Sequence, residues 1–177
     1  NTFTKGKVVV NHETGEVTYN GTPLHGAVVD HLIDLLDNGS NALEAWTLFL
    51  EHLMANPSYR SREQLYGFMQ ANDITINNKG ELLLYKKVRD DYFDVYTGRT
   101  FQYTVGSTVS MDRPLVDDDP NRTCSSGLHV AAHSYISSFG GQRVIICAVN
   151  PADVVSIPTD YNNAKMRVSK LRVVAEH

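Results

Sequence analysis

The stretch Arg143-Val144-Ile145-Ile146-Cys147-Ala148-Val149 decides the fold of this chain. It contains no polar residue after Arg143, and Asn150-Pro151 follows it directly. A short, continuous apolar run that ends in turn residues is typical of a strand buried on both faces of a sheet. The run therefore predicts a central strand and places Cys147 in the hydrophobic core.

Sequence with a two-residue period surrounds this strand. Residues 74–76 and 82–88 flank Asn77-Asn78-Lys79-Gly80, a combination that predicts a hairpin. Further strands are expected at residues 92–96 and 100–103, around a turn at 97–99, and at residues 108–111, 153–157 and 166–174. One or two helical turns are expected between residues 131 and 139.

The first 72 residues have a helical period instead, after an opening hairpin formed by residues 7–10 and 16–19. Three helices are expected, at residues 28–36, 43–54 and 61–69, with Asn38-Gly39 ending the first and Pro57 ending the second. We expect Ser40 or Asn41 to cap the second helix. The pattern Ser61-Arg62-Glu63-Gln64 predicts a capping box that opens the third.

These patterns together predict an α+β fold. An N-terminal hairpin and three-helix unit, residues 1–72, is expected to pack on a mostly antiparallel β-sheet with one short helix. The β-rich unit, residues 73–177, carries the loop from Cys124 to His129.

The bulk composition disfavours several classes of protein. The net charge of −4 and the pI of about 5.9 leave no global basic field for an extended nucleic acid. No apolar run reaches the roughly 20 residues that a membrane-spanning helix needs. The two cysteines, Cys124 and Cys147, are too few for a disulfide framework, so we expect a reduced protein in the cytoplasm.

The segment 116–130 is the part of the chain richest in reactive groups. It combines three consecutive acids, a proline and a glycine with Cys124 and His129, and it has no periodicity. Binding and catalytic groups concentrate on loops that a rigid scaffold holds. We expect one of the acids, Asp117 to Asp119, to cap the loop's own backbone N–H groups.

An ordered series of motifs runs through the same half of the chain. It comprises Leu84-Tyr85-Lys86-Lys87-Val88, Asp94-Val95-Tyr96-Thr97-Gly98, Met111-Asp112-Arg113, residues 116–130, His133-Ser134-Tyr135, residues 150–155 and Pro158-Thr159-Asp160-Tyr161. With the helical stretch 46–51 and Asn72-Asp73-Ile74, this series resembles the rapid-lysis B-type proteins of tailed phages, often described as protectors from prophage-induced early lysis.

The resemblance covers residues 20–175 and carries expectations about function. It implies a phage accessory protein that acts in the host-cell cytoplasm on lysis timing or host exclusion, and it implies no catalytic residue. It also leads us to expect further N-terminal sequence in typical members that is not in this chain.

Arginines, lysines and tyrosines are concentrated in the strand-rich half. Guanidinium groups bind phosphates through paired hydrogen bonds, and tyrosine rings offer a surface for stacking. The composition therefore predicts a site for a nucleotide-derived small molecule. The candidate ligand-binding residues are Tyr85, Lys86, Arg113, Asp119, Arg122, Cys124, His129, His133, Lys165 and Arg167. The alternative is that these side chains form solvated strand faces and cross-strand packing.

Two chemical alternatives concern the cysteine and the histidines. Cys124 and His129, with an aspartate, could serve a cytosolic enzyme that processes a nucleotide or ADP-ribose, although a buried, unreactive thiol is the default expectation. His129 and His133 stand four residues apart, a spacing that would align them on a helix and could serve a metal. The chain has no recognised zinc pattern, and we expect no metal and no cofactor.

A third alternative comes from the helical half. Trp46, Phe49, Tyr59 and Tyr66 exceed what one narrow core stripe uses, and Phe49 lies beside that stripe. Such an aromatic could anchor a host or phage protein or a second copy of the chain, or it could contact the sheet.

The leading prediction is a non-enzymatic phage accessory protein that counters a host or prophage defence, or controls lysis, by binding a nucleotide-derived signal or a host protein. A structural partner of a companion rapid-lysis protein, and a homo-oligomer, are further alternatives.

Overall fold

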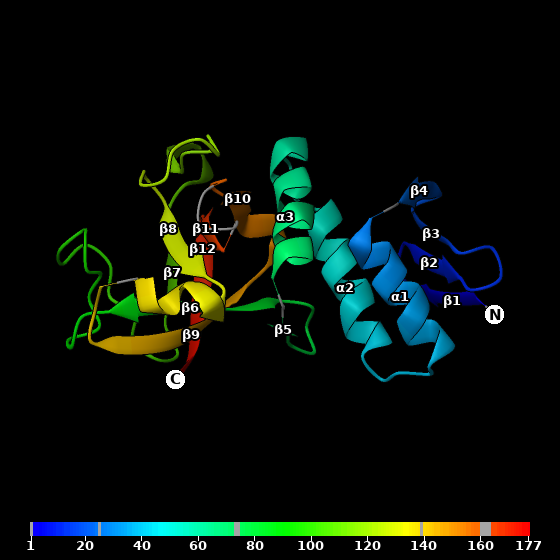
Figure 1. Cartoon of the computed structure of the whole chain (residues 1–177), viewed down its shortest axis with the longest axis horizontal. Coiled ribbons are helices and arrows are strands. Elements are labelled where there is room, and N and C mark those ends of the chain that lie inside the picture. Colours follow the sequence, from blue (N-terminus) through cyan, green and yellow to red (C-terminus); the bar gives the residue numbers. More distant parts are fainter. Residues whose placement is uncertain (1, 25, 73–74, 139, 160–163) are drawn as a thin grey trace.

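The computed structural model describes residues 2–24, 26–72, 75–138, 140–159 and 164–177. Three α-helices lie between a small N-terminal sheet and a large C-terminal sheet (Figure 1). Every strand pair of the described residues is antiparallel. The α+β class and the antiparallel sheet predicted from the sequence are confirmed.

The N-terminal sheet is larger than the predicted hairpin. The hairpin forms its centre, as β2 (Val8–Asn11) and β3 (Glu16–Tyr19). Two strands that the sequence patterns did not indicate, β1 (Thr2–Lys5) and β4 (Thr22–Leu24), extend it in the order β1-β2-β3-β4. Both are short and largely exposed edge strands, so they lack the buried alternate positions that make a strand recognisable.

The three predicted helices are present as α1 (Ala27–Asp37), α2 (Leu43–Met54) and α3 (Tyr59–Ala71). The predicted capping box at Ser61 is wrong. Ser58 is the N-cap of α3, and its hydroxyl accepts the Ser61 N–H at 3.1 Å. Ser61 is buried inside the helix and donates its own hydroxyl to the Val155 carbonyl.

The residue before α2 also differs from the expectation. Ala42 occupies the N-cap position, and its N–H donates to the hydroxyl of Ser40, two residues earlier in the chain, at 3.1 Å. Phe49 is fully buried in the core, so the idea that it anchors a partner is wrong, and the alternative of internal packing holds. Of the four aromatics considered in the helical half, Trp46 and Tyr66 are partly buried, and Tyr59 is 69% exposed.

Eight strands of the described residues form the large sheet, in the order β10-β11-β8-β6-β9-β12-β7, with β5 paired to β6. They are β5 (Thr75–Ile76), β6 (Leu82–Val88), β7 (Thr108–Ser110), β8 (Leu128–Ala131), β9 (Arg143–Val149), β10 (Val154–Ser156), β11 (Lys165–Val168) and β12 (Lys170–Glu176). The apolar run 143–149 is β9, paired on both sides, and Cys147 is fully buried, as predicted.

Short 3₁₀ helices connect some of these strands. They are η1 (Arg113–Leu115), η2 (His133–Ser138) and η3 (Pro151–Asp153). The second falls where the sequence predicted one or two helical turns. The described residues therefore hold more short helices than the one expected.

Two strand predictions need correction. The stretch 166–174 is two strands, because the chain leaves the sheet at Ser169, and the two halves pair with different neighbours, β11 with β8 and β12 with β9. The second hairpin, 92–103, is reduced to one bridge between Phe93 and Gln102, with the intervening turn held by side chains rather than by a ladder.

The helices and the large sheet share one core, which runs from Val8 to Val173. Buried Asn56, after α2, donates to the carbonyls of Pro151 and Val154 at 3.0 and 2.8 Å. Gln64 of α3 accepts the Ile157 N–H at 2.7 Å. These bonds fix the loop after β9 against the helices. The division at residue 72 stays a prediction.

Candidate functional site

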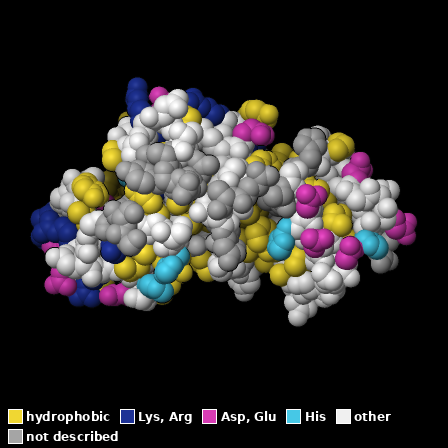
Figure 2. Space-filling view, in the orientation of Figure 1, with side chains coloured by type: hydrophobic (Ala, Val, Ile, Leu, Met, Phe, Trp, Pro, Cys, Tyr) yellow, Lys and Arg dark blue, Asp and Glu magenta, His cyan; other side chains and the backbone are white. Residues whose placement is uncertain are grey.

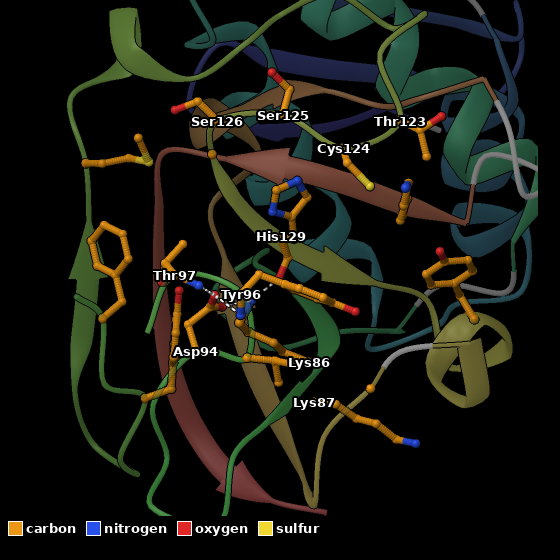
Figure 3. A pocket seen from close by; sticks show the side chains of 18 residues that line it. Lys86, Lys87, Asp94, Tyr96, Thr97, Thr123, Cys124, Ser125, Ser126 and His129 are labelled. Atoms are coloured by element: carbon orange, nitrogen blue, oxygen red, sulfur yellow. Dashed lines mark hydrogen bonds and ion pairs between the residues drawn. The ribbon is translucent and has the colours of Figure 1, made fainter. Parts of the chain in front are cut away.

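A cavity of about 410 Å³ lies beside the loop between η1 and β8 (Figure 3). Its lining combines aromatic and aliphatic side chains with lysines, hydroxyls and a thiol. The lining residues are Lys86, Lys87, Asp94, Val95, Tyr96, Thr97, Phe101, Tyr103, Met111, Thr123, Cys124, Ser125, Ser126, Gly127, His129, Tyr135, Gly140 and Lys165.

Lys86 is the cation at the centre of one wall. The side chains of β6 alternate in burial, and this alternation places Lys86 on the buried side between Leu84 and Val88. Its ammonium group lies 3.1 Å from an Asp94 carboxylate oxygen and donates to the His129 carbonyl at 2.9 Å. A buried charge is tolerated only when it is paired and hydrogen-bonded, as this one is.

Asp94 connects that lysine to the neighbouring turn. Its second carboxylate oxygen accepts the N–H groups of Tyr96 and Thr97 at 3.0 and 2.8 Å. Burial raises the pKa of Asp94, but the Lys86 charge and these N–H groups outweigh burial and hold the pKa below 3.8. Asp94 is therefore ionised at neutral pH, and its hydrogen bonds fix the turn that places Tyr96 in the cavity wall.

His129 is an enclosed, neutral imidazole. Burial and the positive charges of Lys86, Arg167 and Lys165 lower its pKa to about 4. Its Nε2 atom is buried and has no hydrogen-bond partner among the described residues. Figure 3 shows the ring between Cys124 and the Lys86–Asp94 pair.

The pairing of His129 with His133 on one helix is wrong. His129 lies in β8, where it pairs with Arg167, whereas His133 begins η2 after the strand has ended. Within the described part of the chain, no group of three or more His, Cys, Asp or Glu side chains is placed to hold a metal ion.

Cys124 is exposed, so the expectation of a buried thiol is wrong for it. It lines the cavity from the loop. The residues that the structure describes include no hydrogen bond between Cys124 and His129. The pair therefore lacks the nucleophile–base contact that activates a catalytic cysteine.

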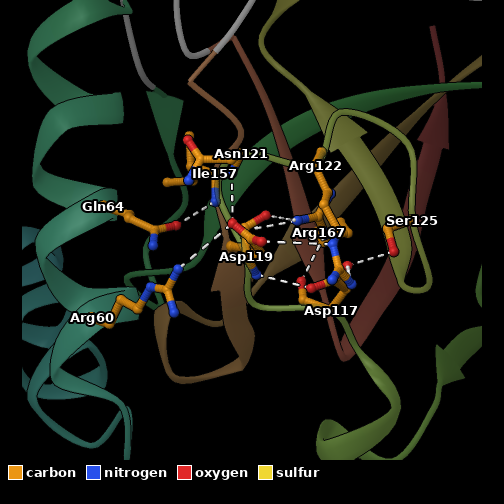
Figure 4. A network of polar contacts seen from close by, with 10 residues as sticks. Arg60, Gln64, Asp117, Asp119, Asn121, Arg122, Ser125, Ile157 and Arg167 are labelled. Atoms are coloured by element: carbon orange, nitrogen blue, oxygen red, sulfur yellow. Dashed lines mark hydrogen bonds and ion pairs between the residues drawn. The ribbon is translucent and has the colours of Figure 1, made fainter.

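Arg167 of β11 forms hydrogen bonds with the loop that precedes β8 (Figure 4). The side chain is fully buried. Its guanidinium donates to the carbonyls of Asp117, Asp119 and Arg122, each at 2.7 Å. Five donors in a planar fork suit several carbonyl groups at once, which a lysine cannot match.

Asp117 stabilises the same loop from within. It accepts the Ser125 hydroxyl at 2.6 Å, the Asp119 N–H at 2.9 Å and an Arg122 N–H at 3.1 Å. These bonds hold the pKa of Asp117 well below 3.8. Asp119 in turn accepts the Asn121 N–H. The expected capping of the loop by its own acids is confirmed.

The ten residues predicted to bind a ligand fall into three groups. Lys86, Cys124, His129 and Lys165 line the cavity. Arg113, Asp119, Arg122 and Arg167 make structural contacts around the loop and the helix joint, including the Arg113 bond to Asn56 at 2.8 Å. Tyr85 and His133 pack edge to face with each other and with His177, outside the cavity lining, with ring centroids 5.0 to 5.4 Å apart.

Comparison with known proteins agrees with the order of motifs. A family model described as "Bacteriophage T4 protein rIIB" matches residues 14–177. The chain belongs to the rIIB family. The resemblance to rapid-lysis B-type phage proteins that the motifs indicate is thereby confirmed.

A curated rIIB relative supports the same assignment. The chain is 43% identical over 169 residues to "Protein rIIB" of Enterobacteria phage T4, an alignment that covers 94% of this chain. The chain spans about half, 54%, of that relative's length. No solved structure matches the chain. No helix among the described residues of this rIIB-family chain is long and apolar enough to cross a membrane.

The sequence patterns missed several residues of the cavity wall in this rIIB-family chain. Asp94, Tyr96 and Tyr103 line the cavity but were not among the candidates. The sequence of the segment 94–98 could have indicated the role of Asp94. Aspartate side chains often accept backbone N–H groups two or three residues later in a turn, and Thr97-Gly98 is turn sequence. Tyr103, 1% exposed, has no local signal and is recognised only by its place beneath Lys86, whose Nζ lies 4.9 Å from the ring centroid.

Proposed function

We propose that this rIIB-family chain is a non-catalytic phage accessory module whose cavity binds a nucleotide-derived small molecule. Binding of that molecule in the host-cell cytoplasm would counter a host or prophage defence, or set the timing of lysis. The convergence of enclosed lysines and aromatic rings on one cavity is the observation that carries this proposal.

The lining suits a ligand with an anionic part and a flat apolar part. Among the residues that the structure describes, three lysines and one carboxylate line the cavity, so these charged groups favour an anion. Lys86 and Lys165 are 5% and 4% exposed, and charges in such surroundings are screened less than surface charges. Tyr96, Phe101, Tyr103 and Tyr135 supply ring surface against which a base can pack.

The distribution of charge along the chain supports the same ligand class. Residues 1–72 hold four Lys and Arg but eight Asp and Glu, whereas residues 73–177 are balanced. On the face in Figure 2, most acidic side chains gather over the N-terminal unit, and the lysines and arginines lie mainly over the sheet. A diffusing anion is therefore repelled by the helical end and favoured at the sheet that carries the cavity.

Binding is better supported than catalysis. His129 is neutral, its Nε2 atom is enclosed, and no hydrogen bond joins it to Cys124 within the described residues. A general base needs a reachable nitrogen and a pKa near the working pH. The enzyme and the structural-partner functions expected from the sequence stay predictions, as does a homo-oligomer.

Calorimetric titration of the purified chain with a panel of cyclic nucleotides, nucleoside diphosphates and ADP-ribose tests the proposal. We expect saturable binding of at least one compound, weakened at least tenfold in Lys165→Gln. Lys170→Gln, which removes an exposed lysine of β12 outside the cavity, is the matched control and should bind as wild type does. No heat of binding across the panel, from a protein that unfolds cooperatively, removes the small-molecule function.

A further inference from the structure

Four phenyl or phenol rings of the described residues line the cavity, and three of them are held by other groups of the protein. Tyr103 is 1% exposed, and the ammonium nitrogen of Lys86 lies 4.9 Å from its ring centroid. Tyr135 is 9% exposed, and the ammonium nitrogen of Lys165 lies 5.8 Å from its ring centroid. Phe101 is partly buried and packs against the hydrophobic core. These three rings therefore belong to the fixed lining of the cavity.

Tyr96 is the fourth ring, and it is 79% exposed although it lines the cavity. Its side chain forms no hydrogen bond, ring contact or cation contact with the described residues. A Cβ atom placed on Gly140 would lie 3.8 Å from the Tyr96 hydroxyl oxygen, so the side chain extends from its own turn towards Gly140, which also lines the cavity. Tyr96 thus presents ring surface that the fold itself does not use.

The backbone that carries this ring is fixed. The Asp94 carboxylate accepts the N–H groups of Tyr96 and Thr97 at 3.0 and 2.8 Å, and the Lys86 ammonium group lies 3.1 Å from the same carboxylate. The Asp94 N–H donates to the Phe101 carbonyl at 3.0 Å, which closes the turn. A tyrosine on a fixed turn loses little conformational freedom on binding, because only its two side-chain torsions remain to be ordered.

The loop on the other side of the cavity is also anchored. Figure 3 shows Tyr96 and Cys124 on opposite sides of the His129 ring. Ser125, the residue after Cys124, donates its hydroxyl to Asp117 at 2.6 Å. The cavity volume of about 410 Å³ lies within the range of small-molecule sites. A planar group can therefore enter between two segments that are both held in place.

We infer that Tyr96 is the specificity-determining residue of the cavity, and that its ring stacks on the planar base of the ligand and holds this base between the turn 94–98 and Cys124. The inference rests on the proposed function, which it makes more specific. Stacking needs a ring face without another contact, and Tyr96 provides one. Because every base has a flat π face, such stacking tolerates any base. Tyr96 therefore selects ligands that carry an aromatic base over phosphorylated sugars, and it does not distinguish one base from another.

Alkylation of Cys124 by N-ethylmaleimide, measured by mass spectrometry of the intact chain, reports whether the cavity is occupied. Cys124 is exposed and Cys147 is buried, so of the two cysteines only Cys124 should react in the folded chain. The probes are adenosine 5′-monophosphate, adenosine, and ribose 5-phosphate, which lacks the base. We expect adenosine 5′-monophosphate to slow the reaction saturably. Ribose 5-phosphate should need an about tenfold higher concentration for the same protection, because it cannot stack.

Three variants test the role of the ring. Tyr96→Ala should raise the concentration of adenosine 5′-monophosphate that gives half protection about tenfold, because the stacking contact is lost. Tyr96→Phe keeps the ring and should stay within about twofold of the wild type. Tyr59→Ala is the matched control, because Tyr59 is 69% exposed and lies outside the cavity lining, and it should leave protection unchanged. The alkylation rate of each variant without a probe is its reference.

The outcomes separate this role of Tyr96 from the proposed function. If Tyr96→Ala is protected as well as the wild type, or if ribose 5-phosphate protects as well as adenosine 5′-monophosphate, the inference is wrong while the nucleotide function stands. If adenosine protects Cys124 through Tyr96 but no nucleotide binds more tightly than adenosine, the stacking role stands and the proposed function fails. A nucleotide that binds in calorimetry but leaves the alkylation rate unchanged at saturation overturns the inference alone. If no probe protects Cys124 and no nucleotide binds, both are overturned.

Discussion

The ammonium group of Lys86 and the carboxylate of Asp94 form an enclosed ion pair, 3.1 Å apart, with side chains 7% and 10% exposed. The pair stands where the alternation of β6 places an inward-facing side chain, beside the buried leucine and valine positions. At this position a charged side chain stands where an apolar one would be expected, and the adjacent carboxylate neutralises its charge. Asp94 also accepts the Tyr96 N–H and so fixes the turn that carries Tyr96.

Breaking this pair from either side should destabilise the protein. Lys86→Met leaves the Asp94 carboxylate enclosed without its cation, and Asp94→Asn leaves the ammonium without its anion. We expect each to lower the free energy of unfolding by about 3 to 5 kcal/mol in urea denaturation. The double variant should lose clearly less than the sum of the two single losses, because neither charge is then stranded. Additive losses would show that the two groups do not interact.

Stability should depend on pH through His129. Its pKa is about 4 in the folded chain and about 6.5 when unfolded, so below pH 6.5 the unfolded chain binds a proton that the folded chain does not. Stability is therefore lost as pH falls from 6.5 towards 4. Between pH 7 and pH 5 we expect this residue to contribute a loss on the order of 2 kcal/mol. His129→Gln should show a correspondingly smaller loss over this range in urea titrations, and an unchanged slope would contradict the assignment.

Arg167 should be irreplaceable by lysine. Arg167→Lys keeps the charge but cannot serve three loop carbonyls and Ser156 with one planar fork. We expect a loss of about 2 to 4 kcal/mol in the free energy of unfolding, with faster amide exchange over residues 117–122. Arg122→Lys is the control, because that side chain is 66% exposed, and it should cost less than about 1 kcal/mol. Equal effects of the two substitutions would show that Arg167 acts only through its charge.

Substituting two glycines, Gly80 and Gly98, distinguishes the cost of a left-handed backbone from the cost of a steric clash. Gly80 has a φ of +73°, and a Cβ there would lie 2.7 Å from the Leu48 carbonyl carbon, while Gly98 has a φ of +66° and nothing within 4 Å. Gly98→Ala should cost about 1 kcal/mol for the left-handed backbone alone. Gly80→Ala should cost at least about 1 to 3 kcal/mol more, because the hairpin must move away from α2. Thermal unfolding measures both, and similar melting temperatures would mean that the hairpin and the helix are not in tight contact.

The element types were predictable because they depend on local periodicity. Three elements show this. Each buries a regular set of side chains, so the pattern can be recognised within a short stretch of sequence: the apolar run of β9, the hairpin around Asn77 to Gly80 and the helical stripe that includes Leu50 and Leu53. Predictions failed where a neighbour distant in sequence decides. Ser61 has the sequence context of an N-cap, but it is buried and its hydroxyl donates to the Val155 carbonyl. The expected strand 166–174 is divided at Ser169, whose N–H donates to the Asp153 carbonyl.

The sequence by itself determined the fold class and the family, because both depend on periodicity and on an ordered set of motifs that can be recognised without coordinates. It also singled out the loop 116–130, part of which lines the cavity. Only the tertiary structure decided which charged groups are internal supports and which face a cavity. Arg167 and Lys165 are two residues apart on one strand, yet one holds the underside of the loop and the other lines the cavity. The physical reason is that the role of a charged side chain depends on the groups that it contacts. Several of these groups are distant in sequence: the His129 carbonyl lies 43 residues from Lys86, and the Asp117 carbonyl lies 50 residues from Arg167.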